Sequence, residues 1–540
     1  MKKAGFPCAI IVLTLLTANV FSQGKYSESI TASELESHVS FLASPLLKGR
    51  MNGDETLDIA SNYIAVQARL AGLKPANNGS YFQPFAIIRK KADPSKTYFE
   101  IISDNDTTRL SESFFHVIPQ GPAELNIEGD IVFAGYGIKS DKYNDLENLD
   151  LKGKIVLVMN RGPLSKDLRP VLNDDYYGQM NFQFKIGPLL SPGPKAILLV
   201  PDPASGFPDF NEAIPGLSGY LSTSTRLSGD KEKPNPVMSM LPKIIFINRK
   251  TADALLSGTG TNLAELQDEI NTTLKPHSFA VNNCRVVIKE QTVDEERILN
   301  NIAGYVEGSH PEKKNEFIIY SSHYDHIGAQ GNEINPGADD NASGCSALLE
   351  IAETFSDLKK KPLRSILFLW VPGEEIGLFG SETYVNNPLI PLEKTVADLN
   401  VDMIGRTKEP ADSTSETPMT GPDEVFVITG GQSSELTAIA NEADKRSPLS
   451  FDYSLSGRQH PLQLFSRSDH FNFVRKDIPV LFFSTGLHSD YHSPRDVLAK
   501  INFQKMEIVT RTMFDIGFTL ANRKERIIVD NPYSSWEKKN

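Results

Sequence analysis

The sequence predicts an α/β protein whose main domain is built on a mixed, mainly parallel sheet, with a smaller β-rich domain inserted into it. Strands alternate with helices from about Ile298 to Leu520, which is typical of layered α/β domains. The stretch 364–372, RSILFLWVP, is almost wholly apolar, as expected for a central strand buried on both faces. Short apolar runs bounded by Gly, Pro and Asp occupy the region 124–288 and indicate strands joined by turns.

The chain of 540 residues is too long for a single hydrophobic core. Near its start, Thr31 opens a helical pattern, and Glu34 three residues later has the spacing of a capping box. We divide the chain into a signal peptide (1–22), an N-terminal part of the main domain (23–123), the inserted domain (124–290), the catalytic α/β domain (291–525) and a C-terminal tail (526–540).

The first 22 residues have the pattern of a targeting signal. Two lysines precede an apolar run from Cys8 to Phe21, and small residues then offer a cleavage site before Gln23. The run is too short for a comfortable membrane span. We therefore expect a secreted or periplasmic protein whose mature form has no membrane span.

Composition excludes some partners and some stabilising devices. A net charge of −13 argues against a nucleic-acid partner, because phosphate binding needs a basic face. After cleavage only Cys284 and Cys345 remain, which is too few for a disulfide framework. Cys345 falls on the apolar face of a predicted helix, where a buried free thiol is favoured.

Residues with metal-binding and acid–base chemistry gather at the predicted carboxyl ends of the strands, where open α/β sheets bind their ligands. Chance could place one or two such residues there, but solvation does not explain five separate placements. His323, Asp325 and His326 follow one strand, Glu374 and Glu375 follow another, Asp402 ends a third, His492 follows a fourth, and Asp339 and Asp340 precede the first helix.

These residue types favour zinc. Imidazole and carboxylate ligands suit a borderline-soft divalent ion, and no thiolate is needed. Two histidines and three carboxylates are too many for one tetrahedral ion with an open position, but they fit two ions that share a bridging carboxylate. The H-E-x-x-H motif of other zinc peptidases and the G-x-S-x-G motif of serine hydrolases are both absent.

Five motifs of this chain resemble the metal-site motifs of the bacterial and fungal zinc aminopeptidase family. They read SSHYDHIG, NPGADDNASG, VPGEEIGLFGSE, NVDMIGR and DYHSPRDV, and they occur in the family's order between His323 and Val497. Glutamate carboxypeptidase, the transferrin receptor and glutaminyl cyclase share that three-layer zinc-exopeptidase fold. The middle region, with VFAGYGI and LKGKIVLV, resembles the protease-associated domain inserted in many members.

The resemblance implies a role for each residue of the motifs. His323 and Asp402 would hold the first zinc ion, Glu375 and His492 the second, Asp339 would bridge the two ions, and Glu374 would be the general base.

Three further roles also come from the resemblance. Asp325 would orient the imidazole of His323 through its other nitrogen. Asp340 would follow a cis peptide after Asp339, and Tyr491 would steady the oxyanion.

Other polar residues in this region have structural interpretations. We expect His326, His470 and His488 to be hydrogen-bonded histidines rather than ligands. For Arg406, a substrate carboxylate and a structural acid are equally good partners.

The expected function is a secreted, zinc-dependent aminopeptidase that hydrolyses N-terminal residues of peptides with two zinc ions and a glutamate base. Three alternatives remain: a glutamate-carboxypeptidase-like enzyme or dipeptidase, a glutaminyl cyclase with one zinc ion, and an inactive binding module like the transferrin receptor. Retention of all five ligands and the base argues against the last two.

Overall fold

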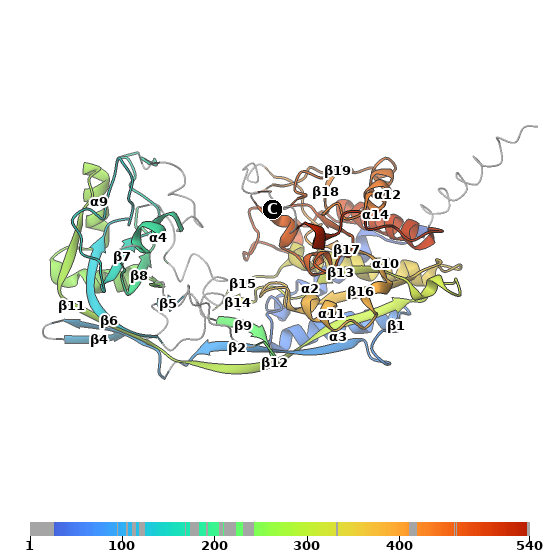
Figure 1. Ribbon diagram of the computed structural model, residues 1–540, viewed down its shortest axis with the longest axis horizontal. Helices are drawn as coiled ribbons and strands as arrows, with labels where there is room; N and C mark the ends of the chain where they lie inside the picture. The colour runs from blue at the N-terminus through green and yellow to red at the C-terminus, as the bar shows by residue number, and fades with distance from the viewer. Residues whose placement is uncertain are drawn as a thin grey trace, which may run out of the picture. The chain divides into compact units, whose positions relative to one another are not determined.

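The structure is a computed structural model (Figure 1). It describes residues 26–536, apart from 94, 104–105, 111–114, 118–124, 168, 173–182, 191–192, 205–208, 210–222, 231–241, 331–332, 410–417, 458–459 and 461. The predicted signal peptide, 1–22, lies outside the described residues. Within the described part, no helix has both the length and the apolar character that a membrane span requires. The chain divides into two compact units, one made of Ile87–Glu296 and the other of the segments on either side.

The first unit is organised by a large mixed sheet. Its four central strands, β20, β17, β13 and β16, are all parallel, and antiparallel pairs flank them. In order across the sheet the strands are β19 (Ser450–Asp452), β18 (Glu424–Ile428), β20 (Val480–Ser484), β17 (Thr395–Val401), β13 (Phe317–His323), β16 (Ser365–Val371), β12 (Thr292–Val306), β2 (Phe82–Ala92) and β9 (Thr223–Leu227), with β1 (Lys74–Pro75) paired to β12. Of these, β9 and most of β2 belong to the segment Ile87–Glu296. The predicted mixed, mainly parallel sheet is confirmed.

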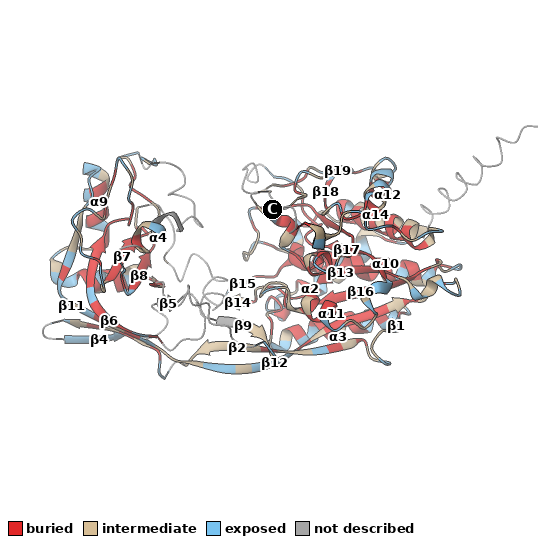
Figure 2. Ribbon diagram, viewed as in Figure 1, coloured by how far each residue is buried: buried red, intermediate tan, exposed pale blue. Residues whose placement is uncertain are grey.

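Helices lie in two layers, because successive residues of a strand point to opposite faces. On one face, Tyr320 packs on Phe355 of α10 and donates a hydrogen bond to the Met513 carbonyl of α14. On the other face, Ile319 belongs to one apolar cluster with Tyr384 of α11 and residues of α13. Every residue of β13, β16 and β17 is buried, as Figure 2 shows.

The helices of this unit match the predicted pattern. Thr31 caps α2 by accepting a hydrogen bond from the Glu34 backbone, and its hydroxyl also donates to the Glu34 carboxylate. The helices are α2 (Ala32–Leu42), α3 (Glu55–Leu70), α10 (Gly344–Asp357), α11 (Phe379–Asn386), α12 (Ser434–Asp444), α13 (His470–Val474) and α14 (Phe503–Asn522). Shorter elements are η1 (Pro45–Leu47), η5 (Lys313–Asn315), η6 (Ala338–Ser343), η7 (Leu392–Lys394), η9 (Leu464–Ser466), η10 (Leu498–Lys500), η11 (Tyr533–Ser535) and the hairpin of β14 (Ala329–Gln330) and β15 (Glu333–Ile334).

The second unit contains an eight-stranded sheet with a parallel centre formed by β6, β7, β8 and β10. Its strands in spatial order are β4 (Asp106–Leu110), β3 (Tyr98–Ser103), β11 (Ser278–Glu290), β6 (Leu125–Ala134), β7 (Ile155–Met159), β8 (Ala196–Val200), β10 (Lys243–Ile247) and β5 (Phe115–Val117). Its helices are α4 (Gln183–Leu190), α8 (Arg249–Leu256), η4 (Ser257–Thr259) and α9 (Leu263–Thr273).

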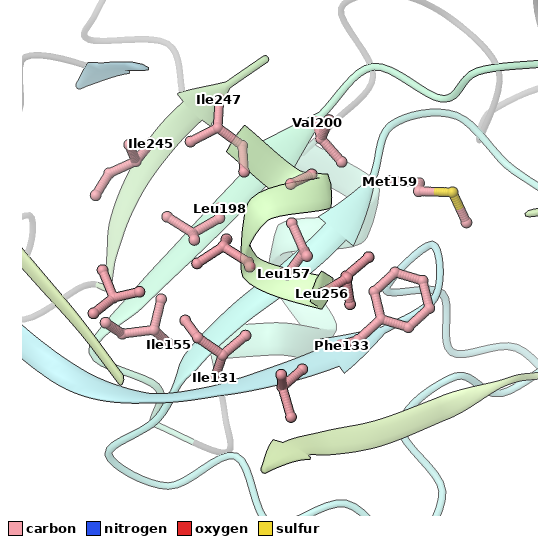
Figure 3. Close-up of a cluster of buried hydrophobic side chains, with 14 of the residues drawn as sticks. Ile131, Phe133, Ile155, Leu157, Met159, Leu198, Val200, Ile245, Ile247 and Leu256 are labelled. Atoms are coloured by element: carbon pink, nitrogen blue, oxygen red, sulfur yellow. The ribbon is translucent and has the colours of Figure 1, made fainter. Parts of the chain in front are cut away.

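A closed apolar core stabilises this second sheet. Alternate residues of the central strands, such as Ile131, Leu157 and Leu198, point to one side and meet Leu256 of α8 (Figure 3). The intervening residues form a separate cluster on the opposite face. Burial on both faces explains why these strands are continuous apolar runs in the sequence.

The boundary predicted between residues 123 and 124 falls inside this unit. β3 pairs with β11, and β5 pairs with β10, so the strands before residue 124 complete the second sheet. The predicted division was wrong because strand pairing between distant segments is not visible in the local pattern.

Both remaining cysteines, Cys284 and Cys345, are free.

Buried Lys505 on α14 makes the stability of the first unit depend on pH. Its ammonium donates to Thr420 Oγ1 at 2.8 Å and to the Gly421 carbonyl at 2.6 Å. Burial lowers the pKa of Lys505 from 10.5 to about 8. Between these values the unfolded chain holds a proton that the folded chain lacks, so the free energy of unfolding rises with pH in this window.

We expect this free energy to increase by roughly 2–4 kcal/mol between pH 8 and pH 10.5 because of Lys505. Lys505→Met removes the titrating group, so this increase in the free energy of unfolding should disappear in the variant. Urea unfolding of both proteins across this pH range measures the difference. Equal pH slopes would contradict the prediction.

Candidate metal centre

The predicted site residues do meet at one edge of the first sheet. His323 is the last residue of β13, Asp402 follows β17 directly, and Glu374 and Glu375 come just after β16. Since these strands and β20 are parallel, their carboxyl ends lie at the same edge. His492 reaches this edge from the loop after β20.

One group of side chains centres on His323. Its Nε2 lies 3.2 Å from Asp402 Oδ1 and 3.4 Å from Asp340 Oδ1. All three residues are buried, and their ligand atoms lie close enough together to hold a metal ion. Ser468 donates a hydrogen bond to Asp402 Oδ2 at 2.9 Å, which leaves Oδ1 facing the histidine.

A second group centres on Glu375. His492 Nε2 lies 3.0 Å from Glu375 Oε2 and 3.2 Å from Asp340 Oδ2. His326 Nδ1 lies 2.8 Å from Glu375 Oε1. These four residues could also hold a metal ion. Asp340 therefore belongs to both groups and offers one carboxylate oxygen to each.

Asp339, predicted to bridge two ions, lies in neither group. Its Oδ1 accepts a hydrogen bond from the Gly405 backbone at 2.6 Å, and its Oδ2 faces His488. The cis peptide also lies one residue later than predicted, between Asp340 and Asn341. In the structure it is Asp340, rather than Asp339, whose two carboxylate oxygens each face one group.

Long-range hydrogen bonds hold the loop that carries Asp340. Asn341 donates to Ser322 Oγ and to the Val401 carbonyl, both at 3.0 Å, and so ties the loop to the ends of β13 and β17. The Asp496 carboxylate accepts hydrogen bonds from the backbone of Asp339 and Asp340.

Buried Arg50 completes this support. Its guanidinium donates to the carbonyls of Tyr324, Pro336, Gly337 and Leu42. One arginine thus joins the segment before α3 to both loops of the site. A guanidinium can do this because it carries five donors in a rigid plane.

Asp325 lies beside the other nitrogen of His323, as predicted, and makes further contacts. The His323 Nδ1 lies 3.2 Å from the Asp325 backbone oxygen and 3.6 Å from its carboxylate. The carboxylate itself accepts from the backbone of Glu374 and Glu375 and from Asn52 Nδ2. Asp325 therefore positions both glutamates as well as the histidine. No sequence signal pointed to Asn52 or Arg50.

Electrostatics distinguish the two adjacent glutamates. Desolvation by the surrounding protein raises the pKa of Glu374 well above its usual range, and the charges of Glu375 and Asp402 add to this effect. The pKa of the neighbouring Glu375 is instead well below its usual value. Burial alone would raise this pKa, but the contacts with His492 and His326 outweigh the effect of burial. Glu374 is thus the carboxyl prepared to hold a proton.

The donor set fits a divalent cation. Four carboxylates meet here with three imidazoles, and buried charge without compensation is costly. Asp340 Oδ2 and His492 Nε2 are buried and have no hydrogen-bond partner within the described structure. Burial alone would lower the pKa of His492, but Glu375 and Asp340 raise it to about 10. A cation between these two atoms would satisfy both.

A small cavity of about 40 Å³ adjoins the two groups. Tyr491 lines it and stacks on His492 with ring centroids 3.8 Å apart. Burial and the acids nearby raise the pKa of Tyr491 well above 10, so its hydroxyl remains a donor. The lining also includes charged residues, namely Asp340, Glu374, Asp402 and Arg467, and apolar ones, namely Met403, Ile428, Leu455, Leu464, Phe482 and Leu487.

Three other residues have structural partners. Arg406 is buried and pairs with Asp490 at 3.0 Å, which settles its open assignment in favour of a structural acid. His470 Nε2 contacts the Phe465 carbonyl, and His488 faces Asp339. Of the histidines predicted to be structural, His326 alone lies within a candidate metal group.

Fold and site together define a layered α/β protein with two candidate metal-binding groups at one edge of its sheet. Residues 301–516, about two fifths of the chain, match Peptidase family M28. This confirms the resemblance to zinc aminopeptidases.

Curated relatives match part of the chain. Aminopeptidase YwaD of Bacillus subtilis is 28% identical over 242 residues, which cover 42% of this chain and 48% of the relative. A probable leucine aminopeptidase of Arthroderma otae is 28% identical over 221 residues, which cover 39% of this chain and 56% of that relative. Transferrin receptor protein 2 of Mus musculus is 27% identical over 51% of this chain and 34% of the receptor. The chain thus spans about half the length, or less, of these relatives.

Solved structures share the fold over almost the whole chain. The zinc aminopeptidase BSAP from Bacillus subtilis superposes with a TM-score of 0.53 at 18% identity, covering 93% of this chain and 98% of that one. The aminopeptidase from Aneurinibacillus sp. strain AM-1 gives the same TM-score and the same identity. That comparison covers 94% of this chain and 98% of the other. At this identity the comparison confirms the α/β fold.

The neighbouring acids Asp339 and Asp340 provide a matched pair for testing the bridge. We expect Asp340→Asn to lose metal from both groups, because it weakens a ligand that the two share. Asp339→Asn should keep its metal, because its carboxylate binds backbone. Metal content after dialysis measures the difference, and thermal unfolding checks that both variants fold. Metal loss in Asp339→Asn alone would restore the original assignment.

Proposed function

We propose that this protein is a zinc-dependent exopeptidase that removes N-terminal residues from peptides. One observation carries the proposal: the carboxylate of Asp340 is shared by two metal-binding groups beside a cavity that Glu374 also lines. The similarity to aminopeptidases supports it. Export from the cytoplasm, predicted from residues 1–22, and a protease-associated character of the second unit belong to the same proposal.

In this proposal each group holds one zinc ion. His323 and Asp402 hold the first, Glu375 and His492 hold the second, and Asp340 bridges them. The nitrogen and oxygen donors suit zinc, and the absence of thiolates from both groups is consistent with it. Zinc bound here would polarise a peptide carbonyl and lower the pKa of a water molecule.

The protein's own groups would then manage protons and orientation. Glu374 accepts a proton from the attacking water and returns it to the leaving amine, which its raised pKa favours. Tyr491 donates a hydrogen bond to the oxygen that becomes negative during attack. Asp325 keeps the Glu374 backbone in place through its 3.3 Å hydrogen bond.

The cavity supports a preference for apolar side chains at the first substrate position. Leu455, Leu464 and Phe482 are among the apolar residues that line it. An acidic side chain would meet three carboxylates, those of Asp340, Glu374 and Asp402, against the single guanidinium of Arg467, and would be repelled.

Glutamine at position 374 should separate metal binding from catalysis. Glu374→Gln keeps the size and the backbone contacts but cannot accept a proton, so we expect kcat to fall about 10²–10⁴-fold with unchanged zinc content. Glu382→Gln, on α11, is a control that should retain activity. Full turnover by Glu374→Gln would show that Glu374 is not the general base.

A substrate panel tests the direction of cleavage. Leucyl-nitroanilide should exceed glutamyl-nitroanilide in kcat/KM by about 10–200-fold, the range that differences in an apolar pocket give. Acetylation of the substrate amine should abolish cleavage, and so should a chelator. Equal cleavage of an N-acetyl peptide would exclude an aminopeptidase, and cleavage from the C-terminus would favour the carboxypeptidase alternative. Cyclisation of N-terminal glutamine would favour glutaminyl cyclase, and zinc-free protein without activity would favour a binding module.

A further inference from the structure

His326 is a buried histidine that the proposed chemistry does not use. It lies three residues after His323 and is 1% exposed. Its Nδ1 forms a 2.8 Å hydrogen bond with Glu375 Oε1, while its Nε2 has no hydrogen-bond partner in the part of the chain described. Glu375 is therefore the group toward which this ring is aimed.

The two oxygens of Glu375 face two different imidazoles. Oε1 is hydrogen-bonded to His326 Nδ1. Oε2 lies 3.0 Å from His492 Nε2, yet His492 Nε2 makes no hydrogen bond within the described residues. One oxygen of the carboxylate is thus already engaged by protein, and the other faces an unpaired nitrogen.

Distances separate a hydrogen-bond donor from a metal ligand. Neighbouring donors on a tetrahedral zinc ion lie roughly 3.3–3.5 Å apart, because each is about 2.0–2.2 Å from the metal. The contacts of His323 with Asp340 and Asp402, at 3.4 and 3.2 Å, are near this spacing. The His326–Glu375 contact of 2.8 Å is instead typical of a hydrogen bond to a carboxylate. The His492–Glu375 contact of 3.0 Å lies between the two ranges, and His326 Nδ1 is 3.6 Å from Asp340 Oδ2.

Packing holds the His326 ring in this orientation. Its backbone N–H donates to the Arg50 carbonyl at 3.2 Å. Gly337 lies so close that a Cβ there would be 2.6 Å from the ring carbons Cγ and Cδ2. A side chain at position 337 would therefore displace the ring, and the glycine there allows the Asp340 loop to pack against it.

We propose that His326 is a positioning residue that binds Glu375 Oε1 and so presents Oε2 alone to the second metal ion. This inference rests on the proposed function, since it assumes that Glu375 is a ligand. A carboxylate held by one oxygen occupies one coordination position, which leaves a position open for the substrate amine. Catalytic zinc ions keep such an open position.

Asparagine and leucine at position 326 distinguish positioning from ligation. Asn places an amide N–H near the position of Nδ1 but is a poor zinc ligand, while Leu fills the space without a donor. We expect His326→Leu to bind the second zinc about 10–100-fold more weakly, as loss of such supporting contacts does. His326→Asn should restore affinity to within about threefold of the wild type.

The measurement is competition for zinc with a chelator of known affinity, accompanied by the visible spectrum of the cobalt-substituted protein. His277→Asn, a partly exposed histidine of the second unit, is the matched control and should change nothing. Equal loss of zinc in both His326 variants, with an altered cobalt spectrum, would show that His326 is a ligand. Unchanged affinity in both would show that it has no role, and wild-type protein that binds no zinc would instead overturn the proposed function itself.

Discussion

The structure of the site depends on one constraint: several carboxylates are buried together at the edge of a sheet, and Asp340 stands between them. Such a cluster is stable only if cations or protons balance its charge. The protein supplies the framework for this cluster from distant segments. Asn341 ties the Asp340 loop to two strands, Asp496 holds its backbone, and Arg50 joins it to the N-terminal segment.

The parallel arrangement of the strands explains why these residues can meet. β13, β16 and β17 are buried throughout and lie side by side in register, so the residues that follow them emerge together. Helices cover both faces of the sheet, so only the carboxyl ends of these strands are left to carry the site. The position of the second unit in the chain leaves this arrangement intact, since its sheet closes its own core.

Much of the fold and site could be predicted from local patterns. Apolar runs predicted β13, β16 and β17. His323, Glu374, Glu375, Asp402 and His492 could be placed at this edge because each lies at the end of a strand or in the loop that follows it. The boundary of the second unit could not be predicted in the same way. β3 and β5 belong to it through pairing with strands more than a hundred residues later in the chain, and such pairing leaves no local signal.

The sequence by itself determined which chemistry is available: the histidines and carboxylates, their places after strands, and a glutamate pair in which one member can act as a base. The tertiary structure alone decided which of two adjacent aspartates faces both groups. It also turned His326 toward Glu375 and made Asn52 and Arg50 part of the site. The physical reason is that a loop side chain's direction depends on backbone torsion and on partners far away in the chain, and a linear pattern specifies neither.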